Sequence, residues 1–148
     1  MDTTGTAFWE HFDHPADMGI RGFGQMPEDA FAQAALALCA ITVDLHTVSP
    51  DSSVQISLEE TDLELLLVRW LNQILYEMNT RAMVFSRCEV AIQESQHQGY
   101  TLRATLWGEV FQAGRQGIGT EVKAATYAQL KVERQSDGLW MAQCVVDV

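Results

Sequence analysis

The sequence predicts an α+β domain in which two helices pack against one side of a mostly antiparallel β-sheet. Apolar residues recur at spacings of three and four over segments 27–43 and 62–79, which is the pattern of amphipathic helices. From about residue 83 onward, apolar and polar residues alternate, which is typical of strands with one buried face. This order of elements favours helices segregated to one face of the sheet.

Length and composition indicate one folded domain over residues 1–148. The chain has 148 residues, of which 47% are hydrophobic and 9% aromatic. A chain of this length buries roughly two-thirds of the surface that its unfolded form exposes. The sequence contains no internal repeat, low-complexity tract or linker that would divide it. We therefore expect a single hydrophobic core.

The first third of the chain is expected to form a strand pair followed by a helix. The strands cover residues 9–14 and 19–24, and Pro15-Ala16-Asp17 forms the turn between them, because proline fixes φ and an aspartate can bond nearby amides. Pro27 fits the first position of the helix over 27–43, and two acidic residues follow it in the first turn.

A strand over 54–58 and a second helix over 62–79 come next. Thr61 and Glu64 match a capping box, in which the side chain of each residue would accept a hydrogen bond from the backbone N–H of the other. The apolar face of this helix is broad, so we expect deep packing, with Trp70 as a core aromatic rather than a binding platform.

The second half of the chain is expected to be a meander. Strands are predicted over 88–92 and 102–106, over 121–134 and, after a tight turn, over 140–146. The glycine-rich segment 113–119 is predicted to be a flexible loop, with its arginine either solvated or facing an acidic patch or phosphate.

Charge and hydropathy narrow the possible functions. Twenty acidic against nine basic residues give a net charge of −11, which disfavours direct, tight nucleic-acid binding and suits a basic partner or a divalent cation. No apolar run reaches the length of a membrane span, and the first residues lack the pattern of a signal peptide, so a cytoplasmic protein without a membrane partner is expected.

The recognisable catalytic motifs are absent from this sequence. GxSxG, HExxH, a phosphate-binding GxxxxGK[ST] loop and an EF-hand spacing do not occur. The three cysteines, Cys39, Cys88 and Cys144, are widely spaced among apolar neighbours, so we interpret them as buried thiols rather than nucleophiles or metal ligands.

Two aspartates near opposite ends of the chain form a candidate metal site. Taken singly, Asp17 fits the capping of a turn and Asp147 a solvated strand end. If the first and last strands are neighbours, both carboxylates would join the carbonyl and terminal carboxylate of Val148. Such hard oxygens bind Ca²⁺, Mn²⁺ or Mg²⁺. His14 would then support a ligand or bond within the turn, unless it is an ordinary surface histidine.

With these residues in place, the sequence resembles the archease family over nearly its whole length. The segment 14–20, HPADMGI, is a form of the family pattern H-x-A-D-x-G-I. The other matching segments occur in the same order as in the family: 62–64 (DLE) with 70–76 (WLNQILY), 108–109 (GE), 119–127 (GTEVKAATY) and 145–148 (VVDV).

The resemblance implies a non-enzymatic accessory protein of the RtcB-type RNA ligase, which seals RNA ends in tRNA splicing and repair with GTP and Mn²⁺. Such a protein promotes guanylylation of the ligase and restores its multiple turnover. The family's metal ligands correspond to Asp17, Asp147 and Val148, with Ca²⁺ as the ion expected in a structure and Mn²⁺ or Mg²⁺ as other candidates. Its functional lysine corresponds to Lys123.

Three residues depart from the family pattern, and two other functions are alternatives. Gln112, Gln116 and Ala128 stand where members often carry Asp, His and His, which affects the details of partner contact rather than the proposed ligands. One alternative is an acidic, chaperone-like scaffold without a metal-dependent role. The other is a small metal-dependent hydrolase, for which the sequence offers no evident general base or supported nucleophile.

Overall fold

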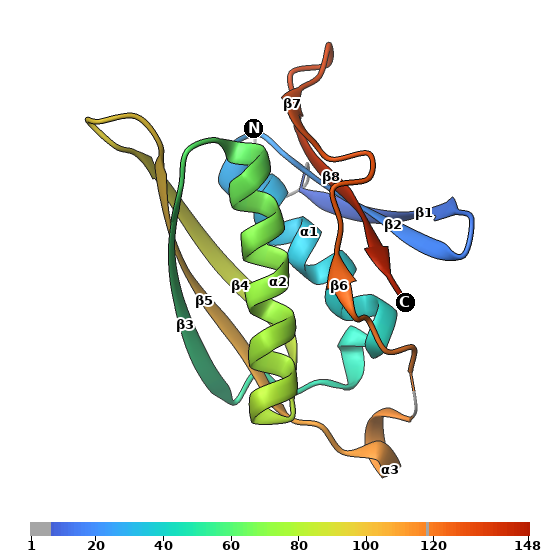
Figure 1. Cartoon of the computed structure of the whole chain (residues 1–148). Helices are drawn as coiled ribbons and strands as arrows, with labels where there is room; N and C mark the ends of the chain where they lie inside the picture. Colours follow the sequence, from blue (N-terminus) through green and yellow to red (C-terminus); the bar gives the residue numbers. More distant parts are fainter. Residues whose placement is uncertain (1–6, 118) are drawn as a thin grey trace.

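The computed structural model describes residues 7–117 and 119–148 and consists of two antiparallel sheets joined by helices (Figure 1). In chain order the elements are β1 (Phe8–His14), β2 (Asp17–Gly24), α1 (Pro27–Thr42), the 3₁₀ helix η2 (Leu45–Thr47), β3 (Ser52–Glu60), α2 (Leu63–Arg81), β4 (Met83–Glu94), β5 (Tyr100–Val110), α3 (Ala113–Gln116), β6 (Ala124–Ala125), β7 (Lys131–Arg134) and β8 (Trp140–Asp147).

The predicted α+β class with antiparallel pairing is confirmed, but the expected single sheet is two sheets. One has the order β1-β2-β8-β6, with β7 also paired to β8, and the other has the order β3-β5-β4. Helix α1 contacts both sheets. On the first sheet, His11 Nε2 of β1 lies 2.8 Å from the carbonyl oxygen of Ala37 in α1. On the second, the Cys88 thiol of β4 donates a hydrogen bond to the carbonyl oxygen of Ala32 in α1. Alternation in a sequence shows which face of a strand is buried, but it does not identify the neighbouring strand.

The prediction of one strand over 121–134 is wrong. This segment pairs with β8 as two short strands, β6 and β7. Ala124 lies opposite Asp147, and Lys131 lies opposite Gln143. Seven residues along the segment therefore lie beside only four residues of β8. Gln129, at φ +53°, lies in the extra length, and Ala128 is exposed rather than inward-facing. The three extra residues form a turn between the two strands, and an odd number of extra residues reverses the alternation of the side chains that follow.

The helices begin close to their predicted positions, but α2 is capped differently. Pro27 opens α1, as predicted. The N-cap of α2 is Asp62, whose carboxylate accepts a hydrogen bond from the backbone of Leu65 at 2.8 Å, so Thr61 does not cap the helix. Glu64 instead accepts a hydrogen bond from the backbone of Val132 and thus links α2 to β7.

The two long helices share one core with both sheets. Trp70 of α2 is fully buried, as predicted, and its indole N–H donates to the carbonyl oxygen of Phe31 in α1 at 3.0 Å. Gly22 of β2 lies directly against α1, where a Cβ atom would be 2.1 Å from the oxygen of Ala30. This close approach holds α1 on the five-stranded sheet. None of the helices in the described residues has the length and apolarity needed to cross a membrane.

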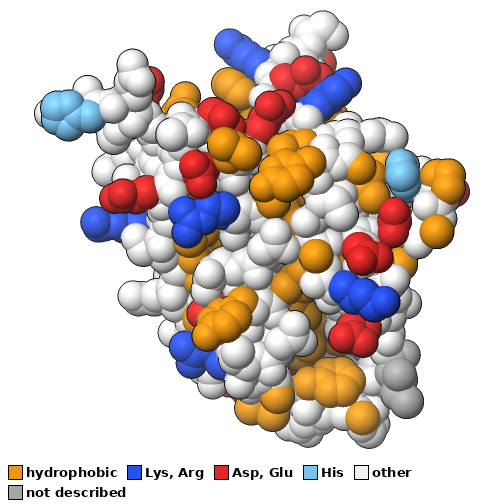
Figure 2. All heavy atoms as spheres, in the orientation of Figure 1, with side chains coloured by type: hydrophobic (Ala, Val, Ile, Leu, Met, Phe, Trp, Pro, Cys, Tyr) orange, Lys and Arg blue, Asp and Glu red, His pale blue; other side chains and the backbone are white. Residues whose placement is uncertain are grey.

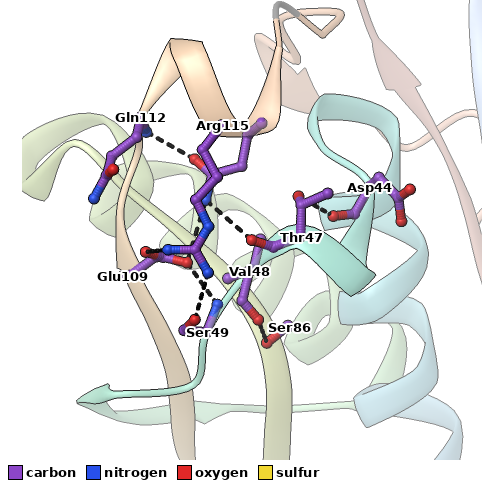
Figure 3. Close-up of polar contacts among 9 residues, drawn as sticks. Asp44, Thr47, Val48, Ser49, Ser86, Glu109, Gln112 and Arg115 are labelled. Carbon is purple, nitrogen blue, oxygen red and sulfur yellow. Dashed lines mark hydrogen bonds and ion pairs between the residues drawn. The ribbon is translucent and has the colours of Figure 1, made fainter.

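The predicted glycine-rich loop 113–119 begins with the short helix α3, which polar contacts hold in place (Figure 3). Glu109, at the end of β5, is buried and accepts hydrogen bonds from the backbone of Ser49, from Arg115 at 3.1 Å and from Gln116 at 3.2 Å. The Arg115 guanidinium also donates to the hydroxyl of Ser49 at 2.6 Å. The arginine therefore meets an acidic group, the second of the two predicted alternatives.

Candidate metal centre

The β1–β2 hairpin fixes the position of Asp17. Its turn consists of Pro15 and Ala16, and Ala16 adopts the left-handed region at φ +61°. The hairpin pairs His14 with Asp17, so the aspartate is the first residue of β2 instead of part of a three-residue turn. In the described residues the Asp17 carboxylate caps no backbone amide, which leaves its oxygens available to a ligand.

The C-terminal strand brings Asp147 beside Asp17. Strands β2 and β8 are antiparallel with Met18 opposite Val146, so the next position along this register places Asp17 opposite Asp147. On the other side of β8, Asp147 pairs with Ala124 of β6. Figure 1 shows the C-terminus of β8 next to the β1–β2 turn. The last strand thus meets the N-terminal hairpin, but its partner there is β2, and the first strand, β1, pairs with β2 rather than with β8.

One row of residues crosses the end of the sheet, and we call it the terminal row: His14, Asp17, Asp147 and Ala124. Directly opposed residues of antiparallel strands project from the same face. Val146 is fully buried in the core, so alternation directs Asp147 and its row to the other face, away from the helices. Val148 follows, half-buried, at the end of the row.

The charges of the terminal row suit a cation. Like charges directly opposite each other in a sheet are destabilising, yet among the described residues no lysine or arginine pairs with Asp17 or Asp147. Two hard carboxylates and the main-chain oxygens of Val148 match the donors that Ca²⁺, Mg²⁺ and Mn²⁺ take. No cluster of three His, Cys, Asp or Glu side chains occurs in the described part of the chain, so such a site depends on main-chain oxygens.

His14 has an unusual environment at the same end of the sheet. Its Nδ1 is enclosed and has no hydrogen-bond partner in the described structure, and it lies 3.8 Å from Asp17 Oδ2. This separation is too long for a hydrogen bond. An enclosed nitrogen without a partner is uncommon in proteins and points to a missing group. The spacing of three residues between His14 and Asp17, across a proline turn, was the sequence signal for their proximity.

Lys123 is tied to the terminal row through its backbone. Its N–H donates to the carbonyl oxygen of Asp147 at 2.8 Å, and Thr42 of α1 holds the preceding segment by donating to the oxygen of Thr120. The Lys123 side chain is exposed and forms no ion pair with a described residue, the nearby Glu121 included. Figure 2 shows acidic and basic side chains interspersed over one face of the molecule.

The fold and this site define a class of protein: an α+β domain in which the second strand of an N-terminal hairpin pairs with the last strand and brings two carboxylates to the same end of the sheet. The model of the archease protein family matches residues 9–148, and the chain belongs to this family. Protein archease of Pyrococcus furiosus is 40% identical over 140 residues, covering 95% of this chain and 98% of its own. That of Thermococcus gammatolerans is 39% identical with the same coverage.

A solved structure supports the same fold. The solution structure of Methanobacterium thermoautotrophicum protein 1598 matches with a TM-score of 0.78 and 27% identity, covering 95% of this chain and 98% of that one. The pairing of β2 with β8 therefore belongs to a fold that is shared with a solved structure.

Proposed function

We propose that this chain is a non-enzymatic activator of an RtcB-type RNA ligase in tRNA splicing and RNA repair, and that it binds a divalent cation at Asp17, Asp147 and Val148. Membership of the archease family supports the partner. The observation that carries the site is the β2–β8 register, which sets Asp17 opposite Asp147 beside the end of the chain.

The proposed work of the site is to assist guanylylation of the ligase. A bound divalent ion supplies positive charge that can stabilise phosphate oxygens during nucleotidyl transfer. Lys123, anchored through its backbone to Asp147, adds a second positive charge on an exposed side chain. The chain itself lacks a recognisable nucleophile motif, so the reacting groups belong to the ligase.

The overall charge suits this partnership. A net charge of −11 repels RNA and attracts a protein with a basic RNA-binding surface, and such attraction raises the association rate more than the affinity. We therefore expect the association rate with the ligase to fall as the salt concentration rises.

The test measures guanylylation and multiple-turnover sealing by a purified RtcB-type ligase with substoichiometric amounts of this protein. Wild type should stimulate both reactions, whereas Asp17→Ala and a form extended by a few residues beyond Val148 should not. Asp13→Ala is the matched control, because it removes an exposed carboxylate from the same hairpin, at a position opposite Met18 rather than in the terminal row.

Two results would contradict the proposal. Wild-type protein that prevents aggregation of several unrelated proteins but does not stimulate the ligase would indicate a general acidic scaffold. Turnover of simple phosphoesters that disappears in Asp17→Asn would indicate a metal-dependent hydrolase.

A further inference from the structure

His14 belongs to the same row of the sheet as the two aspartates, but the hard-oxygen site proposed above leaves its imidazole without a role. The pairing of β1 with β2 places His14 directly opposite Asp17, so their side chains share one face of the sheet. Alternation along β8 places Asp147 on that face as well. In the described residues these three side chains do not gather into one compact cluster, and the close pair among them is His14 and Asp17.

The spacing of the atoms distinguishes a shared ion from a direct hydrogen bond. His14 Nδ1 and Asp17 Oδ2 are 3.8 Å apart, beyond hydrogen-bonding distance. Two donors bound to one ion at about 2.1–2.4 Å lie about 3–4.8 Å apart, depending on the angle between them. The observed separation falls inside that range, and Nδ1 has no partner in the described structure that would compete for its lone pair.

We propose that His14 binds the ion through Nδ1 and makes the site selective for Mn²⁺, or a similar transition-metal ion, over Ca²⁺ and Mg²⁺. This inference rests on the metal site of the proposed function and adds the choice of ion. Carboxylate and carbonyl oxygens accept all three ions, whereas an imidazole nitrogen favours transition metals over Ca²⁺ and Mg²⁺. Removal of His14 should therefore convert a selective site into a general hard-cation site.

The first test is spectroscopic and uses the wild-type protein, so it does not depend on the folding of a variant. Electron spin echo envelope modulation of Mn²⁺ bound to the full chain should show coupling to a ¹⁴N nucleus of a directly bound imidazole. Wild-type protein that binds Mn²⁺ without this coupling would overturn the inference and leave the oxygen-ligand site standing.

The second test compares affinities by titration calorimetry. His14→Ala should weaken Mn²⁺ binding by about tenfold or more and change Ca²⁺ binding by less than about twofold. The control is His97→Ala, which removes an exposed histidine from the β4–β5 turn and should change neither affinity. Equal losses for both ions in His14→Ala would assign His14 to folding of the turn and overturn its role in selectivity.

A third variant distinguishes failure of this inference from failure of the site itself. Asp17→Asn should abolish binding of both ions while the wild type binds them. If the wild type bound neither ion, the proposed site and the role of His14 would both be wrong. If Asp17→Asn lost both ions but His14→Ala kept the wild-type ratio of affinities, only the role of His14 would be wrong.

Discussion

The backbone N–H of Lys123 donates a hydrogen bond to the carbonyl oxygen of Asp147 at 2.8 Å. The contact is between main-chain atoms, so it survives any replacement of the lysine side chain other than by proline. The position of this segment and the chemistry of its side chain can therefore be tested separately.

Lys123→Ala should keep the fold and metal binding but lose ligase stimulation. Because the exposed side chain makes no ion pair with a described residue, we expect a change in unfolding free energy below about 0.5 kcal/mol. Stimulation of guanylylation should fall by about tenfold or more, because a charge near the phosphates is removed. Lys131→Ala, which removes an exposed lysine from β7, is the control, and equal stimulation by both variants would contradict the role of Lys123.

Glu109→Gln should destabilise the protein by about 1–3 kcal/mol, since a buried carboxylate with three donors becomes a neutral amide whose NH₂ group faces other donors. Urea unfolding measures this loss. Glu89→Gln is the control, because Glu89 is 68% exposed in its pair with Arg87, and such pairs contribute about 0–1 kcal/mol. Similar midpoints for the two variants would show that the Glu109 contacts do not stabilise the fold.

Gly22→Ala should cost more than about 3 kcal/mol or prevent folding, because the new Cβ would lie 2.1 Å from the oxygen of Ala30 and 2.3 Å from the nitrogen of Ala34. Gly114→Ala should be neutral or stabilising by up to about 1 kcal/mol, since nothing lies within 4 Å of its Cβ position in α3. Thermal unfolding compares the two substitutions. A Gly22→Ala protein as stable as wild type would contradict the packing of α1 on β2.

The three thiols should resist modification in the folded protein at pH 8. Burial raises the pKa of Cys39 and of Cys144 to about 12, and burial also raises the pKa of Cys88, with smaller contributions from Cys39 and Glu89. The reactive thiolate forms only above these values, so labelling by Ellman's reagent should be slow in buffer and complete in denaturant. A thiol that reacts rapidly in the native protein would indicate local opening around that residue.

The sequence predicted the local structure where side-chain periodicity is strong. Both long helices, the alternation of β4 and β5, and the burial of Trp70 follow from the spacing of apolar residues over several turns or strand steps. The prediction of the α2 cap depended on a single residue and is wrong. The α2 cap is Asp62 rather than Thr61, because both residue types can bond the first free amides and the backbone decides between them.

The prediction of a single strand over 121–134 is wrong because alternation continued in the sequence across the turn that separates β6 from β7. The residues around Gln129 form the extra length beside β8, and hydrogen bonds from the backbone and hydroxyl of Thr126 to Val145 support it. These contacts come from a strand that lies far along the chain. Local pattern therefore contained no signal for the break.

The sequence by itself determined the α+β class, the two helices and the residue types of the candidate metal site, because these depend on composition and short-range spacing. Tertiary structure decided that the strands divide into two sheets, that Asp17 lies opposite Asp147, and that His14 joins their row. Each of these depends on which strands pair and in what register, and pairing between distant segments is set by the packing of the whole core.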